Sequence, residues 1–247
     1  RCVSSQLFGW IEKGMGLHGS QAEYVRVPLA DSTLIRIPEG TKDVEALLLG
    51  DIIPTGYFCA LQAEITPDKI YAVIGCGPVG LMTIIGALQQ GAEKIYAIDT
   101  VKERLGMASG LGAISLNASQ TNVVETLREV TENRGVDAVM EAVGNNATGK
   151  LAYDIVRPGG IISMVGVCTD EHMAFSPTEA YNKNLTFKVG RCPARFLMDT
   201  LLPKVLEGKY DYTSMVTHQM KLCEGARGYD LFANKKDNCM KVVLSAH

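Results

Sequence analysis

The sequence predicts an α/β protein built on a parallel, doubly wound sheet. From residue 70 onward, short apolar runs alternate with amphipathic segments of helix length. A glycine-rich turn follows the first of these runs. The chain has 247 residues, of which 47% are hydrophobic and 21% charged, so it can bury a sizeable core in one large or two modest domains.

The alternating segment is expected to contain a strand before and after each helix, because parallel strands need a crossover connection. Strands are expected near 70–74, 94–98, 113–116, 138–140, 161–165 and 185–189. Helices are expected at 79–90, 102–111, 122–132 and 147–156.

The two ends of the chain do not continue this alternation. Polar and apolar residues alternate at 23–28 and 33–37, which is the pattern of half-buried strands. Short helices are expected at 44–49 and 52–63, and helices at 196–207 and 221–232 with a strand at 240–244 close the chain. The predicted domains are therefore a β-rich segment at 1–50, the sheet domain at 51–189, and a return to the first domain at 190–247.

The glycine-rich turn has the spacing GxGxxG between a strand and a helix. Gly75 permits the tight turn, Gly77 lets the backbone approach a pyrophosphate, and Gly80 lets helix and strand pack closely. Pro78 and Val79 open the helix, whose free N–H groups attract phosphate. Glycine-rich turns also recur for structural reasons, so this motif alone is a weak signal.

An acid at the end of the next strand strengthens the prediction. Asp99 lies nineteen residues beyond Gly80, where a carboxylate accepts hydrogen bonds from the adenosine ribose hydroxyls. A carboxylate there would repel a 2'-phosphate, which favours NAD over NADP. Arg104 weakens this preference slightly, because a nearby Arg can accommodate the phosphate.

Composition excludes several classes of partner. The net charge of −3, the pI near 5.9 and the absence of a long basic run argue against nucleic acid and anionic membranes, so a small molecule is expected. The apolar stretches fall short of the roughly 20 residues of a membrane helix. Seven scattered cysteines fit a reducing compartment, and we expect a cytoplasmic protein. The sequence shows no CxxC pair or His/Cys cluster that could build a zinc site by itself.

Ordered motifs run through most of the chain: Gly19–Pro28, Asp51–Tyr57, the loop at 75–80, Glu141–Gly144, Arg157–Gly160, Val165–Val167 and Lys241–Leu244. Together they resemble the zinc-containing medium-chain dehydrogenase/reductases, the family of alcohol dehydrogenases. The resemblance implies a Rossmann dinucleotide-binding domain and an incomplete β-rich, GroES-like catalytic domain split in sequence around it. It also implies hydride transfer between NAD and a primary alcohol, secondary alcohol or polyol, or the matching carbonyl compound.

The same resemblance implies roles for individual residues. Asp51 matches the third ligand of a catalytic zinc, and Thr55 matches a residue beside the nicotinamide. Cys2 matches the last of four cysteines of a structural zinc. Without the resemblance, Asp51 is interpreted as a helix cap or an exposed loop acid. The remaining matches are cofactor contacts: Arg104, Val143, Gly144, Val165, Gly166, Val167, Val189 and Lys241.

The sequence departs from the family in its zinc ligands. A Cys and a His that would complete the catalytic site have no match, so we expect the N-terminal part of the catalytic domain to be missing and the chain alone to be inactive. Two alternatives stay open: an NAD-binding fragment without catalysis, and a zinc-free quinone or enoyl reductase of the same superfamily, which would more often use NADPH. The resemblance further implies a homo-oligomer, because the strand near 185–189 is a sheet edge.

Overall fold

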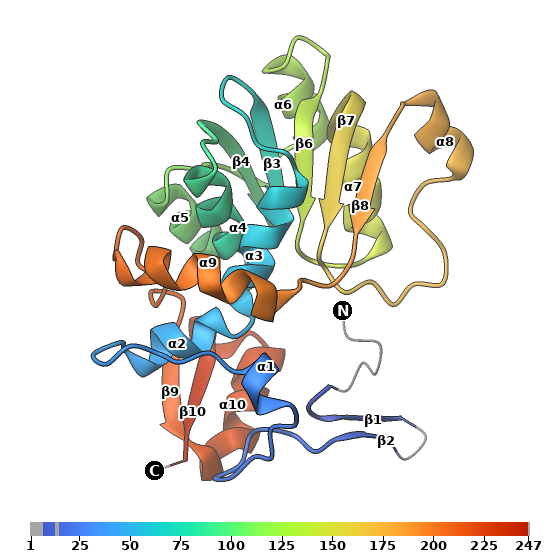
Figure 1. Cartoon of the computed structure of the whole chain (residues 1–247). Helices are drawn as coiled ribbons and strands as arrows, with labels where there is room; N and C mark the ends of the chain where they lie inside the picture. The colour runs from blue at the N-terminus through green and yellow to red at the C-terminus, as the bar shows by residue number, and fades with distance from the viewer. Residues whose placement is uncertain (1–6, 13–14, 247) are drawn as a thin grey trace. The chain divides into compact units, whose positions relative to one another are not determined.

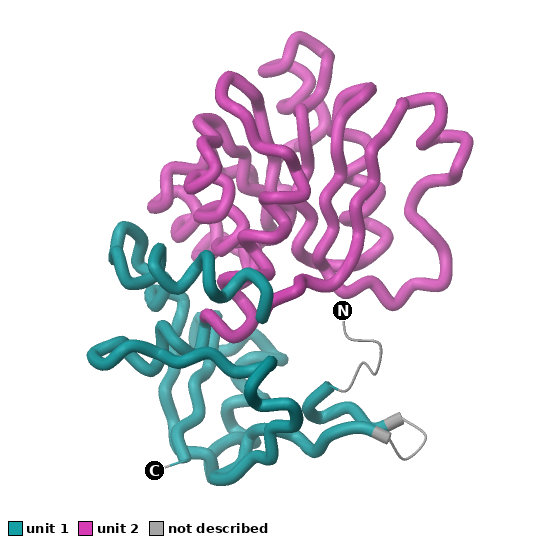
Figure 2. The backbone as a smooth tube through the Cα atoms, viewed as in Figure 1, with its two compact units in different colours: residues 1–48, 195–247 teal, residues 49–194 magenta. Residues whose placement is uncertain are grey.

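The computed structural model describes residues 7–12 and 15–246 of the chain (Figure 1). It divides into two compact units (Figure 2). One consists of residues 49–194 and is called the sheet unit below; the other combines residues 1–48 with 195–247 and is called the end unit. The interpretation of these units as cofactor and catalytic domains, with boundaries near residues 50 and 189, stays a prediction.

The sheet unit contains a six-stranded parallel sheet, which confirms the predicted fold class. The strands follow the order β5-β4-β3-β6-β7-β8. The order reverses between β3 and β6, which makes this the topological switch point of the sheet. The strands are β3 (Ile70–Ile74), β4 (Lys94–Asp99), β5 (Ile114–Asn117), β6 (Val136–Glu141), β7 (Val156–Met164) and β8 (Thr186–Val189).

Helices cover both faces of this sheet. α6 (Val123–Glu129) and α7 (Asn146–Ile155) pack on one face, where Leu127 and Ile155 are fully buried. α3 (Ile52–Gln62) and α4 (Pro78–Gln89) contact the strands from the other face. The predicted helices of this unit are confirmed, and one further short helix, which was not predicted, is added. The remaining helices of the unit are α5 (Lys102–Gly110) and α8 (Pro177–Asn182).

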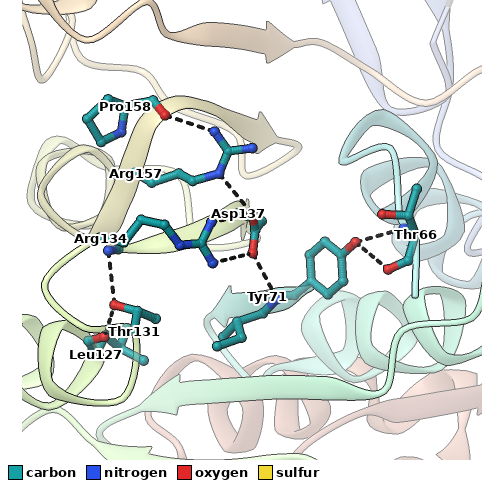
Figure 3. Close-up of polar contacts among 10 residues, drawn as sticks. Thr66, Tyr71, Leu127, Thr131, Arg134, Asp137, Arg157 and Pro158 are labelled. Carbon is teal, nitrogen blue, oxygen red and sulfur yellow. Dashed lines mark hydrogen bonds and ion pairs between the residues drawn. The ribbon is translucent and has the colours of Figure 1, made fainter. Parts of the chain in front are cut away.

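A charged cluster fixes the amino end of β6 (Figure 3). Asp137, only 7% exposed, accepts hydrogen bonds from both terminal nitrogens of Arg134 at 2.7 and 3.0 Å. It also accepts from Arg157 Nε at 2.8 Å and from the Ile70 N–H at 3.0 Å. Burial raises the pKa of Asp137, but these four donors outweigh it and hold the pKa well below the usual range. The cluster therefore ties β6 to β3 and β7.

The end unit is made of short elements. A two-stranded antiparallel ladder joins β1 and β2, and a parallel one joins β9 and β10. The elements are β1 (Trp10–Glu12), β2 (Met15–Leu17), α1 (Ala30–Thr33), α2 (Asp43–Leu49), α9 (Ala194–Leu206), β9 (His218–Lys221), η1 (Leu222–Glu224), α10 (Gly225–Ala233), η2 (Lys236–Asn238) and β10 (Val242–Ser245).

Two predictions for the end unit are wrong. The strands expected at 23–28 and 33–37 are absent, and Tyr24 is 91% exposed. Alternation predicts a strand only where a partner strand supplies hydrogen bonds, and no described strand pairs with these residues. The helix expected at 221–232 begins later, at Gly225, because β9 and the 3-10 turn η1 occupy residues 218–224.

No single helix in the described ranges has the length and apolar character needed to cross a membrane. By those two criteria alone, α2 and α3 taken together form one bent pair that could. A mostly buried core helix passes the same test, and Ile52, Ile53 and Cys59 of α3 are buried.

Candidate nucleotide-binding site

The glycine-rich loop connects β3 to α4 with almost no space for side chains. Gly75 has a φ of +89°, and a Cβ there would lie 2.5 Å from Val143 Cγ2. A Cβ on Gly80 would lie 1.7 Å from the Gly75 carbonyl oxygen, so only glycine permits this approach of helix to loop. At Gly77 the nearest atom would be Arg104 Nη1 at 3.8 Å, which leaves its backbone open to a ligand.

The first turn of α4 presents donors next to this open backbone. Gly77 is the N-cap and makes no side-chain capping bond, and Pro78 occupies the first turn. The N–H groups of Val79 and Gly80 have no acceptor within the helix. Free donors and the positive end of the helix dipole together attract phosphate.

Asp99 links the end of β4 to the glycine-rich loop. Its Oδ2 accepts a hydrogen bond from the Cys76 N–H at 2.7 Å. Its Oδ1 accepts from the N–H groups of Thr100 at 2.7 Å and Val101 at 2.9 Å. A carboxylate oxygen accepts two bonds, so Oδ2 keeps one acceptor position for a ligand hydroxyl.

The carboxyl ends of β6 and β7 lie on the other side of the switch point. Glu141 Oε1 accepts from the N–H groups of Val143 and Gly144, both at 2.9 Å. The main-chain oxygen of Glu141 accepts from the N–H groups of Val165 at 3.0 Å and Gly166 at 3.2 Å. One residue therefore holds both loops at this edge.

Apolar side chains are exposed along this part of the edge. Val143 is 44% and Val167 is 70% exposed, and Val189 at the end of β8 is exposed as well. A Cβ on Gly144 would lie 2.5 Å from the Val167 N, so the two loops are in direct backbone contact. The edge thus offers an apolar surface beside the polar glycine-rich loop.

Three polar side chains meet at the start of α3. The exposed Asp51 is the N-cap but makes no capping bond, and its Oδ1 accepts from Thr55 Oγ1 at 3.1 Å. Cys192 lies against the same pair: burial raises the pKa of its thiol to about 12, the Thr55 hydroxyl opposes this shift and the Asp51 charge adds to it. No group of three His, Cys, Asp or Glu side chains in the described ranges could hold a metal. These residues do not fit a catalytic zinc, which takes three protein ligands.

Comparisons with known proteins identify the family of this chain. A family model described as "Zinc-binding dehydrogenase" matches residues 78–200. The solved structure of an alcohol dehydrogenase from Thermus sp. ATN1 superposes on this chain with a TM-score of 0.89 and 40% sequence identity. The match covers 95% of this chain and 67% of the Thermus chain. This chain belongs to the zinc-type alcohol dehydrogenase family.

Curated relatives from fungi carry related names. The zinc-type alcohol dehydrogenase B of Aspergillus flavus is 39% identical over 98% of this chain. A medium chain reductase/dehydrogenase of Acremonium sp. is 46% identical over 73% of this chain. The matched regions are 56% and 63% of the relatives' own lengths, so the chain spans less than two thirds of either.

The structure brings most of the predicted cofactor residues of this family to one edge of one sheet. The loop at 75–80, Asp99 and Arg104 lie on one side of the switch point, and the valines and glycines of the β6 and β7 loops lie on the other. Lys241 belongs to the end unit, where it lines a pocket of about 210 Å³ with Tyr229 and Phe232. Cys2 lies outside the described residues. The roles of all these residues stay predictions.

Two residues at these sites were not predicted from the sequence. Glu141 entered the sequence analysis only through the motif Glu141–Gly144, although an acid that directly follows the apolar run at 138–140 is a recognisable signal. Cys192 gave no signal, because its proximity to Asp51 arises only from folding.

Proposed function

We propose that the whole protein transfers hydride between NAD and an alcohol, which is a primary alcohol, a secondary alcohol or a polyol, or the matching carbonyl compound. The proposal depends on one observation: the carboxyl edge of the sheet has different chemistry on the two sides of its switch point. A phosphate-binding loop with Asp99 lies on one side, and exposed apolar side chains lie on the other. A dinucleotide has a charged centre with a ribose on each side, and it binds across such a switch point. The names of the relatives support alcohol as the substrate class.

We propose NAD as the cofactor on the position of Asp99. Its carboxylate is fixed by three N–H donors and cannot turn away from a ligand bound at the loop. A 2'-phosphate would meet this negative charge at close range, which disfavours NADP. The same argument disfavours a zinc-free, NADPH-dependent reductase. Arg104, beside Gly77, is the cation that would soften the preference.

For the residues described, nucleotide binding without turnover is a second candidate. The observation that favours it is the donor set at Asp51, which lacks the third side chain that a catalytic zinc requires. The names of the relatives make zinc an expected component of the whole protein. The homo-oligomer and the cytoplasmic location stay predictions.

Calorimetric titration of the chain with NAD and NADP tests the cofactor proposal. We expect NAD to bind at least about tenfold more tightly, the equivalent of about 1.4 kcal/mol. Asp99→Asn should reduce that ratio, while the matched variant Asp154→Asn, on the exposed surface of α7, should leave it unchanged. Binding of neither nucleotide, or a preference for NADP, would show that the cofactor proposal is wrong.

A turnover assay distinguishes hydride transfer from nucleotide binding without catalysis. The absorbance of reduced nicotinamide is followed with NAD and a series of primary alcohols, secondary alcohols and polyols, with and without added Zn²⁺. Turnover of any alcohol supports hydride transfer. Tight NAD binding with no turnover under every condition supports nucleotide binding alone for this chain.

A further inference from the structure

Glu141 is a buried carboxylate with an unusual set of partners. It ends β6, in which every residue is buried, and its own exposure is 0%. A carboxylate removed from water is stable only when cations or hydrogen-bond donors surround it. Oε1 has two N–H donors, whereas Oε2 is buried and has no hydrogen-bond partner in the described part of the chain. None of the ion pairs found there involves Glu141.

The donors that Glu141 does have all come from two loops. The side chain holds the loop after β6 through Val143 and Gly144, and the main-chain oxygen holds the loop after β7 through Val165 and Gly166. Both loops lie at the carboxyl edge of the sheet, on the side of the switch point opposite Asp99. The position of this one residue therefore sets the shape of that half of the edge.

Close contacts leave these loops little freedom to adjust. A Cβ on Gly166 would lie 2.5 Å from Glu141 Oε2 and 2.3 Å from the Gly144 N. Val143, which Glu141 holds by its N–H, fills the space beside Gly75, where a Cβ would lie 2.5 Å from Val143 Cγ2. A displacement of the Glu141 carboxylate would therefore move Val143 and the two loops that Glu141 holds. Packed contacts of this kind transmit shifts because protein interiors have low compressibility.

We propose that Glu141 is a positioning residue for the nicotinamide half of the cofactor, an inference that rests on the proposed function. With the pyrophosphate at the glycine-rich loop and the adenosine ribose at Asp99 on β4, the second nucleotide must extend over β6 and β7. That half of the cofactor would lie on Val143 and Val167, whose loops Glu141 holds. Glu141 is buried and acts through these loops, without touching the cofactor.

Two ligands distinguish binding of the nicotinamide ring from binding of the rest of the cofactor. ADP-ribose contains the adenosine, the pyrophosphate and the second ribose but lacks the nicotinamide ring, whereas NADH contains all four. Both are titrated against the wild-type chain and two variants. Glu141→Asp keeps the charge but shortens the side chain by one methylene, so one oxygen no longer reaches both N–H groups. Glu141→Gln keeps the length and one acceptor oxygen.

Glu141→Asp is expected to weaken NADH binding by about tenfold, the equivalent of about 1.4 kcal/mol. The same variant should leave ADP-ribose affinity within about twofold of the wild type, a difference of about 0.4 kcal/mol. Glu141→Gln is expected to weaken NADH binding by only about threefold, because its amide oxygen still accepts both bonds, although without the charge that strengthens them. If Glu141→Asp does not fold, the ratio of the two affinities in Glu141→Gln decides the question.

Ser163→Ala is the matched control. Ser163 is also fully buried, in β7, and its Oγ donates to the Cys59 carbonyl oxygen at 2.8 Å. Its loss removes a buried hydrogen bond from the same neighbourhood but none from the two loops. The variant should melt at a lower temperature and keep the wild-type ratio of NADH to ADP-ribose affinity.

The outcomes distinguish this inference from the function on which it rests. If the Glu141 variants weaken both ligands equally, or neither, Glu141 is a structural residue and the inference is wrong while nucleotide binding stands. If Ser163→Ala shifts the ratio as much as Glu141→Asp does, any damage to the core has the same effect and the inference is again overturned. If the wild-type chain binds neither ligand, the proposed function fails first, and the inference fails with it.

Discussion

Replacing Asp137 by Asn is expected to destabilise the sheet unit strongly. The carboxylate accepts four hydrogen bonds, two of them from Arg134 and one from Arg157 (Figure 3). An Asn side chain has one acceptor oxygen, so two of the four donors lose their acceptor and both cations lose their counter-charge. Removing one partner of a buried ion pair costs about 3–5 kcal/mol. Since Arg134 is half-exposed and can regain water, we expect the lower end, about 3 kcal/mol.

The effect should depend on pH in a direction that the structure fixes. The folded-state pKa of Asp137 is lowered, because the donors from Arg134, Ile70 and Arg157 outweigh the effect of burial. A group with a lowered pKa contributes its stability above the unfolded pKa, which is about 3.9 for Asp, and loses it as the pH falls further toward the folded value. The difference in the free energy of unfolding between wild type and Asp137→Asn should therefore be constant near neutral pH and shrink below about pH 4.

Urea unfolding of both proteins, followed by circular dichroism over this pH range, measures the difference directly. Asp154→Asn is the control, since Asp154 forms an exposed pair with Lys150 on α7. Such pairs contribute about 0.5 kcal/mol or less. An Asp137→Asn variant as stable as the control, or a difference that grows in acid, would refute the assignment of stability to this cluster.

Two further predictions concern the glycine-rich loop and the thiols. Gly80→Ala places a methyl group 1.7 Å from the Gly75 oxygen, so it should abolish NAD binding in calorimetry and cost about 1–3 kcal/mol by overpacking; normal binding would contradict the geometry. Burial raises the pKa of Cys59 and Cys76 to about 12, so alkylation of the native protein near neutral pH should spare both, and labelling of either before unfolding would contradict their burial. Peptide mass spectrometry should instead find the label on the exposed thiols, Cys168 and Cys223.

The sheet unit could be predicted from the sequence because its signals are local. Each strand is a short apolar run between turn residues, since parallel strands are buried on both faces. The strand expected at 94–98 is observed as Lys94–Asp99, and that expected at 70–74 as Ile70–Ile74. The predicted alternation of strands and helices then leaves few possible topologies for the sheet, because crossover connections between parallel strands are right-handed.

The end unit was harder to predict because its strands depend on distant partners. β9 is four residues long, with polar and apolar residues mixed, and it exists through pairing with β10, where His218 pairs with Val242, 24 positions later. The alternation of polar and apolar residues at 23–28 led to the opposite error, because it predicted a strand where no described partner strand lies. A period of two identifies a surface that could be half-buried, but only tertiary contacts decide whether it is.

In the candidate site, too, features set by local sequence could be predicted and features set by distant partners could not. The glycine-rich loop could be predicted because its chemistry comes from consecutive backbone atoms between Gly75 and Gly80. The meeting of Asp51, Thr55 and Cys192 could not, because it joins residues far apart in sequence. Glu141 is intermediate: its position after an apolar strand is visible in the sequence, but its hydrogen bonds and its unpartnered oxygen are not.

β6 carries a buried carboxylate near each end, and the two have different partners. Asp137, near the amino end, has four donors and two cations, as expected of a group that stabilises the fold. Glu141, at the carboxyl end, has two donors to one oxygen and none to the other. Removing one partner of a buried ion pair is strongly destabilising because it leaves an uncompensated charge, whereas Glu141 has no cation partner among the described residues that its replacement would leave uncompensated. Glu141→Gln should therefore unfold at a higher urea concentration than Asp137→Asn, although Glu141 is the more buried residue. The reverse order would mean that Glu141 contributes more to stability than the complete Asp137 cluster does, and the argument that its main role is to shape the cofactor edge would lose its basis.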